Sequence, residues 1–362
     1  MERVFNFSAG PSVLPESVLK TAQAEMLNYK GCGTSVMEMS HRSKVYLEIF
    51  DNATALLKEI MNVPDNYKIL FLQGGASMQF AMIPMNLLTA KKKVDIVDSG
   101  HWAALAVKES HKFADTKVVA SSKESKYDHF PVLDPATFTP DADYFHFTSN
   151  NTIFGTRLRG SDLPNTGNVP LVCDMSSNIL SEVYDVSKFG LIYAGAQKNM
   201  GPAGVTVVII RDDLLPRSPE SLPTMLNYNT HVKADGMYNT PPTYGIYLAG
   251  LVYQWVKDLG GVAAVEKINE EKAGIIYDAI DNSSIFKGYT AKKDRSLMNI
   301  TFSATSEELD NKFCKEAEKA GLVNLKGYRT VGGMRVSTYN AMPIEGCKAL
   351  AEFMKKFEMD NK

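Results

Sequence analysis

Seven short apolar runs between residues 68 and 210 constrain the fold of this chain more than any other feature. Several of them alternate with stretches of helical periodicity, such as 76–89 and 101–113. This rhythm is typical of an α/β domain with a mostly parallel seven-stranded sheet. The runs are apolar throughout, as expected of strands covered by helices on both faces. They occupy residues 68–73, 94–98, 117–120, 144–147, 169–174, 191–195 and 205–210.

The loop between the last two runs is short, consisting of QKNMGPAG and a few flanking residues. It cannot hold a crossover helix, which favours an antiparallel pairing at this point. Two helical stretches precede the sheet, at residues 15–29 and 43–61. Pro15 suits a first helical turn, and the second stretch places its apolar side chains on one face.

The pattern of strand-like and helical stretches changes after residue 260. Two strand-like runs stand among three helical stretches there, which indicates a smaller α+β domain, and the Gly260-Gly261 pair is the expected joint. The runs are 297–303 and 334–339, and the helical stretches are 262–280, 306–320 and 344–358. We therefore expect an N-terminal segment (1–14), a large cofactor-binding domain (15–260) and a small C-terminal domain (261–362).

Composition argues against several classes of function. The net charge of −2 gives no indication of nucleic acid or of an acidic membrane surface as a partner. No apolar run approaches the roughly 20 residues of a membrane span, and the N-terminus lacks the features of a signal peptide. The four cysteines form no CxxC pair, and no His lies beside them at metal-ligand spacing. We expect reduced thiols in a cytoplasmic enzyme without a metal site.

Two residues at predicted strand ends indicate the chemistry. Asp174 ends one apolar run, and Lys198 follows the next. Open α/β sheets bind ligands at the carboxyl ends of their strands, so both side chains are expected to face one crevice. Pyridoxal phosphate needs such a pair, because a lysine amine forms a Schiff base with its aldehyde and a carboxylate keeps its pyridine nitrogen protonated. Taken alone, an exposed Lys and a helix-capping Asp remain the more ordinary explanations.

A phosphate site is indicated by the segment QGGASMQF (73–80), where a strand leads into two glycines and a helix begins near Ala76. Glycines let the backbone approach a ligand closely, and a helix N-terminus attracts phosphate. Ser77 adds a hydroxyl. The segment is neither GxGxxG nor a P-loop, so nucleotide binding is poorly supported, and a bare turn is the alternative.

Side chains suited to an aromatic ring and to anions complete the pattern. Trp102 follows a strand-like run and can stack on a pyridine ring, although ordinary burial explains a lone Trp better. The chain has only nine Arg against thirty Lys, and Arg42, Arg329 and Arg335 stand in segments rich in Gly and small residues. Arg binds carboxylate and phosphate bidentately, which Lys cannot match, while structural salt bridges are an equally good explanation for each.

Six segments of the chain resemble the phosphoserine aminotransferases, class V aminotransferases among the fold-type I pyridoxal-phosphate enzymes. The resemblance runs from about residue 4 to residue 358, and the motifs are specific to that family only when taken together. They are FNFSAGPSVLP, GTSVMEMSHRSK, FLQGGASMQF, IYAGAQKNMGPAG, YNTPPTYGIY and LKGYRTVGGMRVSTYNAMP.

The resemblance implies a role for each matching residue. Lys198 would form the Schiff base, and Asp174 would pair with the pyridine nitrogen. The other contacts with the cofactor would come from Ala76, Ser77 and Gln197 at its phosphate, Trp102 over its ring and Thr152 at its ring oxygen.

The resemblance also implies a homodimer with shared active sites. Asn239 and Thr240 would reach the phosphate of the partner subunit's cofactor. The substrate would be bound by His41, Arg42, Arg329 and Arg335. One position departs from the family pattern: Tyr328 stands where His is expected, and Tyr cannot carry positive charge near neutral pH.

The implied reaction transfers the amino group of glutamate to 3-phosphohydroxypyruvate, giving O-phosphoserine and 2-oxoglutarate. The sequence leaves open whether the related 4-phosphohydroxythreonine of vitamin B6 synthesis is also a substrate. A cysteine desulfurase shares the fold but needs a cysteine on a mobile loop, whereas Cys314 and Cys347 both lie in helical patterns. A non-catalytic binding protein on the same scaffold would be expected to lose the lysine, the acid or the arginines, and here all are present.

Overall fold

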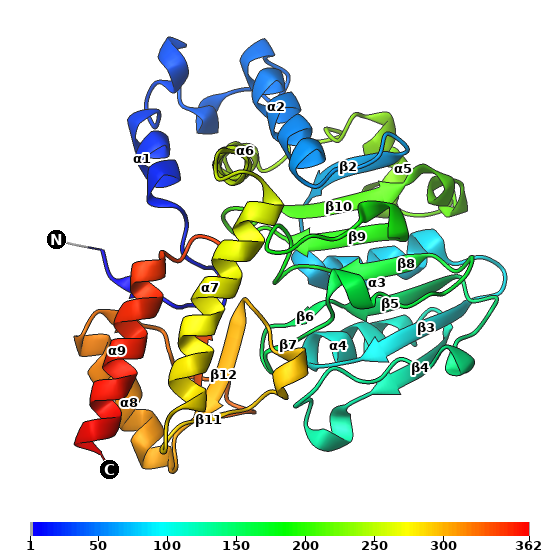
Figure 1. Ribbon diagram of the computed structural model, residues 1–362. Helices are drawn as coiled ribbons and strands as arrows, with labels where there is room; N and C mark the ends of the chain where they lie inside the picture. The colour runs from blue at the N-terminus through cyan, green and yellow to red at the C-terminus, as the bar shows by residue number, and fades with distance from the viewer. Residues whose placement is uncertain (1–2, 362) are drawn as a thin grey trace.

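The computed structural model describes residues 3–361 and consists of two layered units side by side (Figure 1). Residues 1–2 and 362, at the outer ends of the expected N-terminal segment and C-terminal domain, lie outside the described range. The helices are α1 (Glu16–Ala24), α2 (Lys44–Ile60), α3 (Gly75–Leu87), α4 (His101–Ser110), α5 (Tyr228–Lys233), α6 (Thr243–Asp258), α7 (Val262–Asp281), α8 (Glu307–Lys319) and α9 (Ile344–Asp360).

All seven apolar runs form strands of one sheet, in the order β2-β10-β9-β8-β5-β3-β4. Only β10 runs against its neighbours, pairing antiparallel with both β9 and β2, so the pairing expected from the short loop is confirmed. The strands are β2 (Tyr67–Leu72), β3 (Lys93–Asp98), β4 (Asp115–Ser121), β5 (Tyr144–Thr148), β8 (Leu171–Asp174), β9 (Phe189–Gly195) and β10 (Thr206–Arg211).

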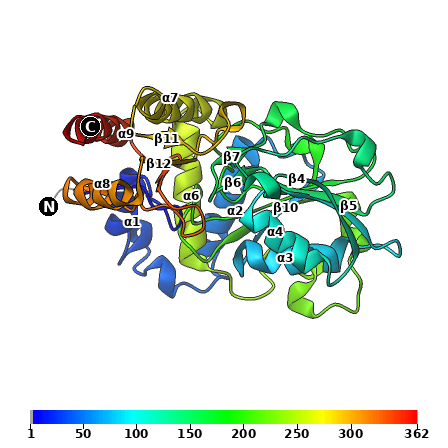
Figure 2. The same cartoon turned by 90° about the horizontal axis from the view of Figure 1, so that it is seen from below.

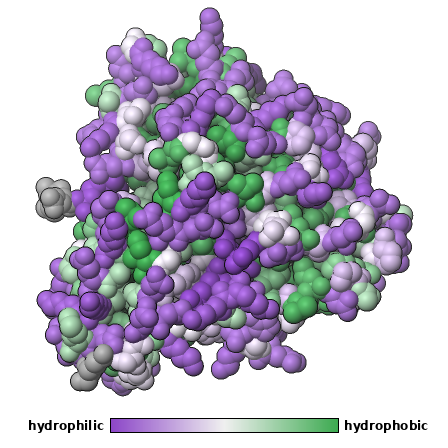
Figure 3. Space-filling view, in the orientation of Figure 1, coloured by the Kyte–Doolittle hydropathy of each residue, from purple (hydrophilic) through white to green (hydrophobic). Residues whose placement is uncertain are grey.

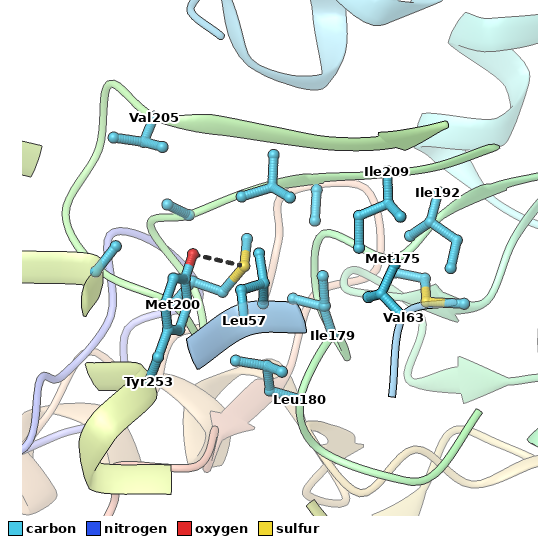
Figure 4. Packing of buried hydrophobic residues seen from close by; sticks show 14 of the residues in the cluster. Leu57, Val63, Met175, Ile179, Leu180, Ile192, Met200, Val205, Ile209 and Tyr253 are labelled. Carbon is cyan, nitrogen blue, oxygen red and sulfur yellow. Dashed lines mark hydrogen bonds between the residues drawn. The ribbon is translucent and has the colours of Figure 1, made fainter. Parts of the chain in front are cut away.

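Helices cover both faces of this sheet, which explains why its strands are apolar throughout. On β10, Val207 and Ile209 pack in a cluster that includes α2 and α6, whereas Val208 and Ile210 pack in one that includes α3 and α4. Figure 4 shows part of the first cluster, where the hydroxyl of Tyr253 lies 3.7 Å from the sulfur of Met200. Neighbouring residues of one strand therefore belong to opposite layers.

The chain after residue 260 forms a second core around a three-stranded sheet, β11-β12-β14. Its strands are β11 (Lys287–Gly288), β12 (Asn299–Ser303) and β14 (Met334–Ser337), and α7, α8 and α9 pack against it (Figure 2). The first residues of the chain join this core, because β1 (Phe5–Asn6) pairs with β13 (Leu322–Val323) and Phe7 is fully buried in it. A short hairpin of β6 (Asn150–Asn151) and β7 (Thr156–Arg157) completes the strands.

Several elements differ from the sequence expectation, among them the short helix α5 and the two-residue strands, which were not predicted. The first helix ends at Ala24, and a 3₁₀ turn at Tyr29–Gly31 replaces its last part. The long helix α6 was not predicted, because its residues 246–250 are buried in succession and leave no amphipathic stripe. On the face drawn in Figure 3, hydrophilic side chains predominate. Among the described residues, no helix is long and apolar enough to cross a membrane.

Candidate active site

Four adjacent parallel strands each lead to one of the predicted site residues. In the order β9-β8-β5-β3, Lys198 follows the first strand, Asp174 ends the second, Thr152 follows the third and Trp102 follows the fourth. Because these strands are parallel, their carboxyl ends meet at one edge of the sheet. The amino end of α3 lies at the same edge, since β2 also runs parallel to β9.

Asp174 is almost completely buried, with 4% of its surface exposed. Burial raises the pKa of its carboxyl group, while hydrogen bonding from Ser176 and the charge of Lys198 act in the opposite direction. The amide of Ser176 donates to Oδ1 of Asp174 at 2.9 Å. The carboxylate is therefore fixed in orientation and lies close enough to Lys198 to interact with its charge.

Lys198 is held by Thr152. The Nζ atom of Lys198 donates to Oγ1 of Thr152 at 2.8 Å, and a guanidinium nitrogen of Arg335 donates to the carbonyl oxygen of Thr152 at 3.3 Å. The pKa of Lys198 is lowered to about 8, mainly by burial and also by the charge of Arg335, against the opposing charge of Asp174. A lysine with such a pKa is partly neutral near physiological pH, as a nucleophile or base must be.

The N-terminal segment crosses directly over this lysine, a contact that no sequence motif predicts. The amide of Ser12 donates to the carbonyl of Gln197 at 2.9 Å, and its hydroxyl donates to the carbonyl of Lys198. Gly10 has a φ of +136°, and a Cβ there would lie 3.3 Å from Cγ of Lys198. Only glycine combines that backbone conformation with such a close approach.

The glycine pair before α3 adopts left-handed conformations, with φ of +88° at Gly74 and +63° at Gly75. A Cβ at Gly74 would lie 2.6 Å from Cβ of Met78, so this turn requires glycine. Ala76 and Ser77 stand in the first turn of the helix, where amide groups have no intrahelical partner and the helix dipole is positive. The predicted phosphate site is thus a helix amino end at the edge that carries Lys198.

Trp102 is half-buried in the first turn of α4, and its ring centroid lies 5.2 Å from that of His101. The ring of Tyr328 lies 5.9 Å from that of His101, so the 327–333 loop reaches this part of the site. That loop is closed by a 2.8 Å hydrogen bond from the amide of Gly327 to the carbonyl of Gly333. Arg329, at its tip, is exposed.

The remaining predicted residues form a second group. Oγ1 of Thr240 lies 3.3 Å from Nδ1 of His41, and Arg42 and Asn239 are exposed nearby in the sequence. Within residues 3–361, no hydrogen bond or ion pair joins this second group to the residues around Lys198. The chain therefore gathers Lys198, Asp174, Thr152 and Arg335 in one place and leaves His41, Arg42, Asn239 and Thr240 in another.

Comparison with known proteins places the chain in a family. The sequence model of the class-V aminotransferases matches residues 4–350. The chain belongs to this family. It is 54% identical to the phosphoserine aminotransferase of Lysinibacillus sphaericus over 358 residues, covering 99% of this chain and 98% of that protein. It is 55% identical to that of Geobacillus kaustophilus over 358 residues, covering 99% of both.

Solved structures of class-V aminotransferases agree with the fold. The phosphoserine aminotransferase from Bacillus circulans subsp. alkalophilus superposes with a TM-score of 0.96 at 49% identity, covering 100% of both chains. A pyridoxal-phosphate-bound phosphoserine aminotransferase from Trichomonas vaginalis gives a TM-score of 0.92 at 39% identity, covering 98% of this chain and 100% of that one. These relatives confirm the expected fold and family.

Pyridoxal phosphate is the cofactor, and the residues of this class-V aminotransferase fit it. A buried carboxylate at Asp174 suits a protonated ring nitrogen, because burial raises its pKa and a positive partner offsets the cost of burying its charge. Lys198 stands beside it with a lowered pKa, and a helix amino end at the same edge suits a phosphate.

Proposed function

We propose that this protein transfers the amino group of glutamate to 3-phosphohydroxypyruvate, giving O-phosphoserine and 2-oxoglutarate. The observation that carries the proposal is the placement of Lys198 between Thr152 and the buried Asp174, at the strand edge where α/β sheets bind ligands. Phosphoserine aminotransferases more than half identical to the chain support the choice of substrate.

The proposed chemistry divides between Asp174 and Lys198. When bound, the cofactor supplies an electron-poor ring that stabilises negative charge on the α-carbon of the substrate. Asp174 holds the proton on the ring nitrogen, because its buried carboxylate gains a positive partner there. Lys198, as a neutral amine, would take the proton from the α-carbon of the substrate at Nζ and deliver it on the cofactor side, and its pKa of about 8 suits both transfers.

Other residues position the cofactor in this proposal. The amides of Ala76 and Ser77 bind its phosphate together with Gln197, whose side chain lies 2.7 Å from where a Cβ of Gly195 would stand. Trp102 stacks on the ring from the first turn of α4. Thr152 contacts the ring oxygen through the hydroxyl that now accepts from Lys198.

Arginines bind the anionic groups of the substrate. Arg335 takes the α-carboxylate, since it already reaches the main chain of Thr152 beside Lys198. Arg42, Arg329 and His41 take the distal carboxylate or phosphate, which a guanidinium can bind bidentately. Tyr328, next to Arg329 in the sequence, offers a hydroxyl and adds no positive charge.

We also propose a homodimer in which the second group crosses into the partner's site. Thr240 contacts His41 within one chain, so a loop that carries Thr240 and Asn239 across an interface carries His41 and Arg42 with it. Mixed dimers test this proposal: a Lys198→Ala chain combined with an Asn239→Ala, Thr240→Ala chain should regain one intact site. No recovery in verified mixed dimers would mean that each site is self-contained.

We also propose that the chain forms two domains and that the protein is cytoplasmic. Separate hydrophobic clusters, which divide shortly after Gly260-Gly261 because Val265 still belongs to the first, support a large domain of residues 15–260 and a small one of residues 261–362. Of the N-terminal segment proposed for residues 1–14, residues 5–7 pair and pack with the small domain. The four free cysteines support a cytoplasmic location, where thiols stay reduced.

The decisive experiment measures kcat/KM for phosphoserine, glutamate, 4-phosphohydroxythreonine and alanine with the appropriate keto acids. Lys198→Ala should abolish turnover of all four while the protein stays folded. Arg42→Ala and Arg329→Ala should lower kcat/KM for the substrates with a distal anion by about 30-fold or more and leave alanine, which has no distal anion, nearly unchanged. Equal losses for alanine would show that these arginines support the fold instead. If wild-type enzyme showed no turnover of phosphoserine, the proposed substrate would be wrong.

A further inference from the structure

A lysine outside the described site is completely buried in the C-terminal unit. Lys272, on α7, has no exposed surface, and its Nζ atom donates to three main-chain carbonyls. The acceptors belong to Tyr339 at 2.5 Å, Asn340 at 3.1 Å and Met342 at 3.2 Å. An ammonium group has three donors and no acceptor, so these three oxygens use its full capacity.

The three carbonyls lie on one short connection, residues 339–342, between β14 and α9. The strand before this connection carries Arg335. Tyr339 adopts a left-handed conformation, with φ of +35°, which few residues other than glycine accept. Carbonyls that converge in this way need a shared donor, since they would otherwise remain buried without partners. Lys272 therefore fixes the path of the connection.

The connection contacts the side chain of the residue after Lys198 and the N-terminal segment that crosses this lysine. The amide of Asn340 donates to Oδ1 of Asn199 at 2.9 Å, and Asn199 is the residue after the lysine. The hydroxyl of Tyr339 donates to the carbonyl of Ala9 at 2.6 Å. Ala9 precedes Gly10, whose main chain packs on the Lys198 side chain, and Ser12 holds the carbonyls of Gln197 and Lys198.

We propose that Lys272 is a positioning residue for transamination, which acts through residues 339–342 to fix Lys198 between the N-terminal segment and Asn199. This inference rests on the proposed function for its kinetic consequences. Two further contacts strengthen the same connection: Asn269, one helical turn before Lys272, donates to Oδ1 of Asn340 at 2.9 Å, and Asn340 donates to the carbonyl of Leu180 at 2.9 Å. The connection is thus clamped from α7 and joined to the large domain.

A simpler reading treats Lys272 as a support of the C-terminal core only. The two readings differ in what they predict for Lys198, because Lys272 makes no direct contact with it. Ile276 offers a matched control: it is one turn further along α7, is fully buried in the same core and has no polar group. Its truncation disturbs packing of the helix and leaves the three carbonyls paired.

The test compares Lys272→Met and Ile276→Ala with wild type in three measurements. The first is the rate at which cofactor-free enzyme captures pyridoxal phosphate, followed by absorbance, which reports the readiness of Lys198 without any substrate. The second is amide hydrogen exchange in residues 8–13. The third is kcat and KM separately.

Lys272→Met should slow capture and lower kcat by about 10- to 100-fold, with KM changed less than about threefold, because a small displacement of a reacting group has effects of this size. Exchange in residues 8–13 should be about 10-fold faster, whereas Ile276→Ala should match wild type in all three. Equal losses in Ile276→Ala, or wild-type capture and exchange in Lys272→Met, would overturn the inference.

Tyr339→Phe decides the matter if Lys272→Met does not fold, because it leaves Lys272 in place and removes only the two hydrogen bonds of the hydroxyl, the one donated to Ala9 at 2.6 Å and the longer one accepted from Asn299 at 3.3 Å. It should slow capture at least about threefold and speed exchange in residues 8–13, and unchanged values would refute the route through Tyr339. Capture and exchange need no substrate, so they report on Lys272 even if wild-type enzyme failed to aminate 3-phosphohydroxypyruvate.

Discussion

Replacing Lys198 by Met should change how the stability of the cofactor-free enzyme depends on pH. Burial lowers the pKa of the folded lysine from 10.5 to about 8. Between these values the unfolded chain holds a proton that the folded chain has lost, so the free energy of unfolding of the wild type rises with pH. At about 1.36 kcal/mol per pKa unit, the whole window contributes about 3 kcal/mol.

The variant has no group that titrates at this position. The free energy of unfolding of Lys198→Met does not rise with pH in this way. The free energy of unfolding of the variant minus that of wild type should therefore fall by about 2 kcal/mol between about pH 7.5 and pH 9.5. The variant also lacks the hydrogen bond to Thr152, but this loss changes the difference in free energy of unfolding by about the same amount at every pH. Only the slope with pH identifies the buried ammonium.

Urea unfolding of both proteins, stripped of cofactor and followed by circular dichroism, measures this slope at several pH values. Lys319→Met is the matched control, because Lys319 is exposed in the last turn of α8. Its difference from wild type should be flat over the same range. If the difference for Lys198→Met were also flat, within about 0.5 kcal/mol, the lysine would not have the lowered pKa on which the mechanism depends.

Three further predictions follow from single contacts. Arg335→Met should raise the pKa of Lys198, since the charge of Arg335 lowers it. In the same unfolding series, the rise of the free energy of unfolding with pH should then begin at a higher pH than in wild type. Arg157→Met should cost about 3–5 kcal/mol in urea unfolding, because it leaves Glu182 buried without the cation that lies 2.8 Å away; a loss below about 1 kcal/mol would mean that Glu182 becomes protonated or hydrated. Gly10→Ala should lower kcat about 10-fold or more, since its Cβ would press on Lys198 at a φ that alanine disfavours, and wild-type kinetics would show that the segment can shift freely.

Strands and their end residues could be predicted because their signals are local. Each of the seven runs became a strand, and Asp174 and Lys198 met because parallel strands place their ends together. The order of the strands had no such signal, since the position of β2 beside β10 depends on pairing between residues far apart in the chain.

The parts of the site that were missed depend on main-chain contacts. Ser12 binds the carbonyls of Gln197 and Lys198, about 185 residues away, and such bonds leave no pattern in the side chains. Lys272 was missed for a related reason, because a lysine in a helix normally lies on the surface. A buried lysine is recognisable only when its three acceptors are seen around it.

The parallel pairing of β1 with β13 has a consequence for the order in which the protein matures. Residues 5–6 leave the ribosome more than 300 residues before their partner strand at residues 322–323 is synthesised. The large domain can fold during synthesis, while the segment over Lys198 has to wait for almost the whole chain. Capture of the cofactor should therefore be a late event, and a nascent chain halted before residue 322 should already hold a folded sheet and still lack a closed site.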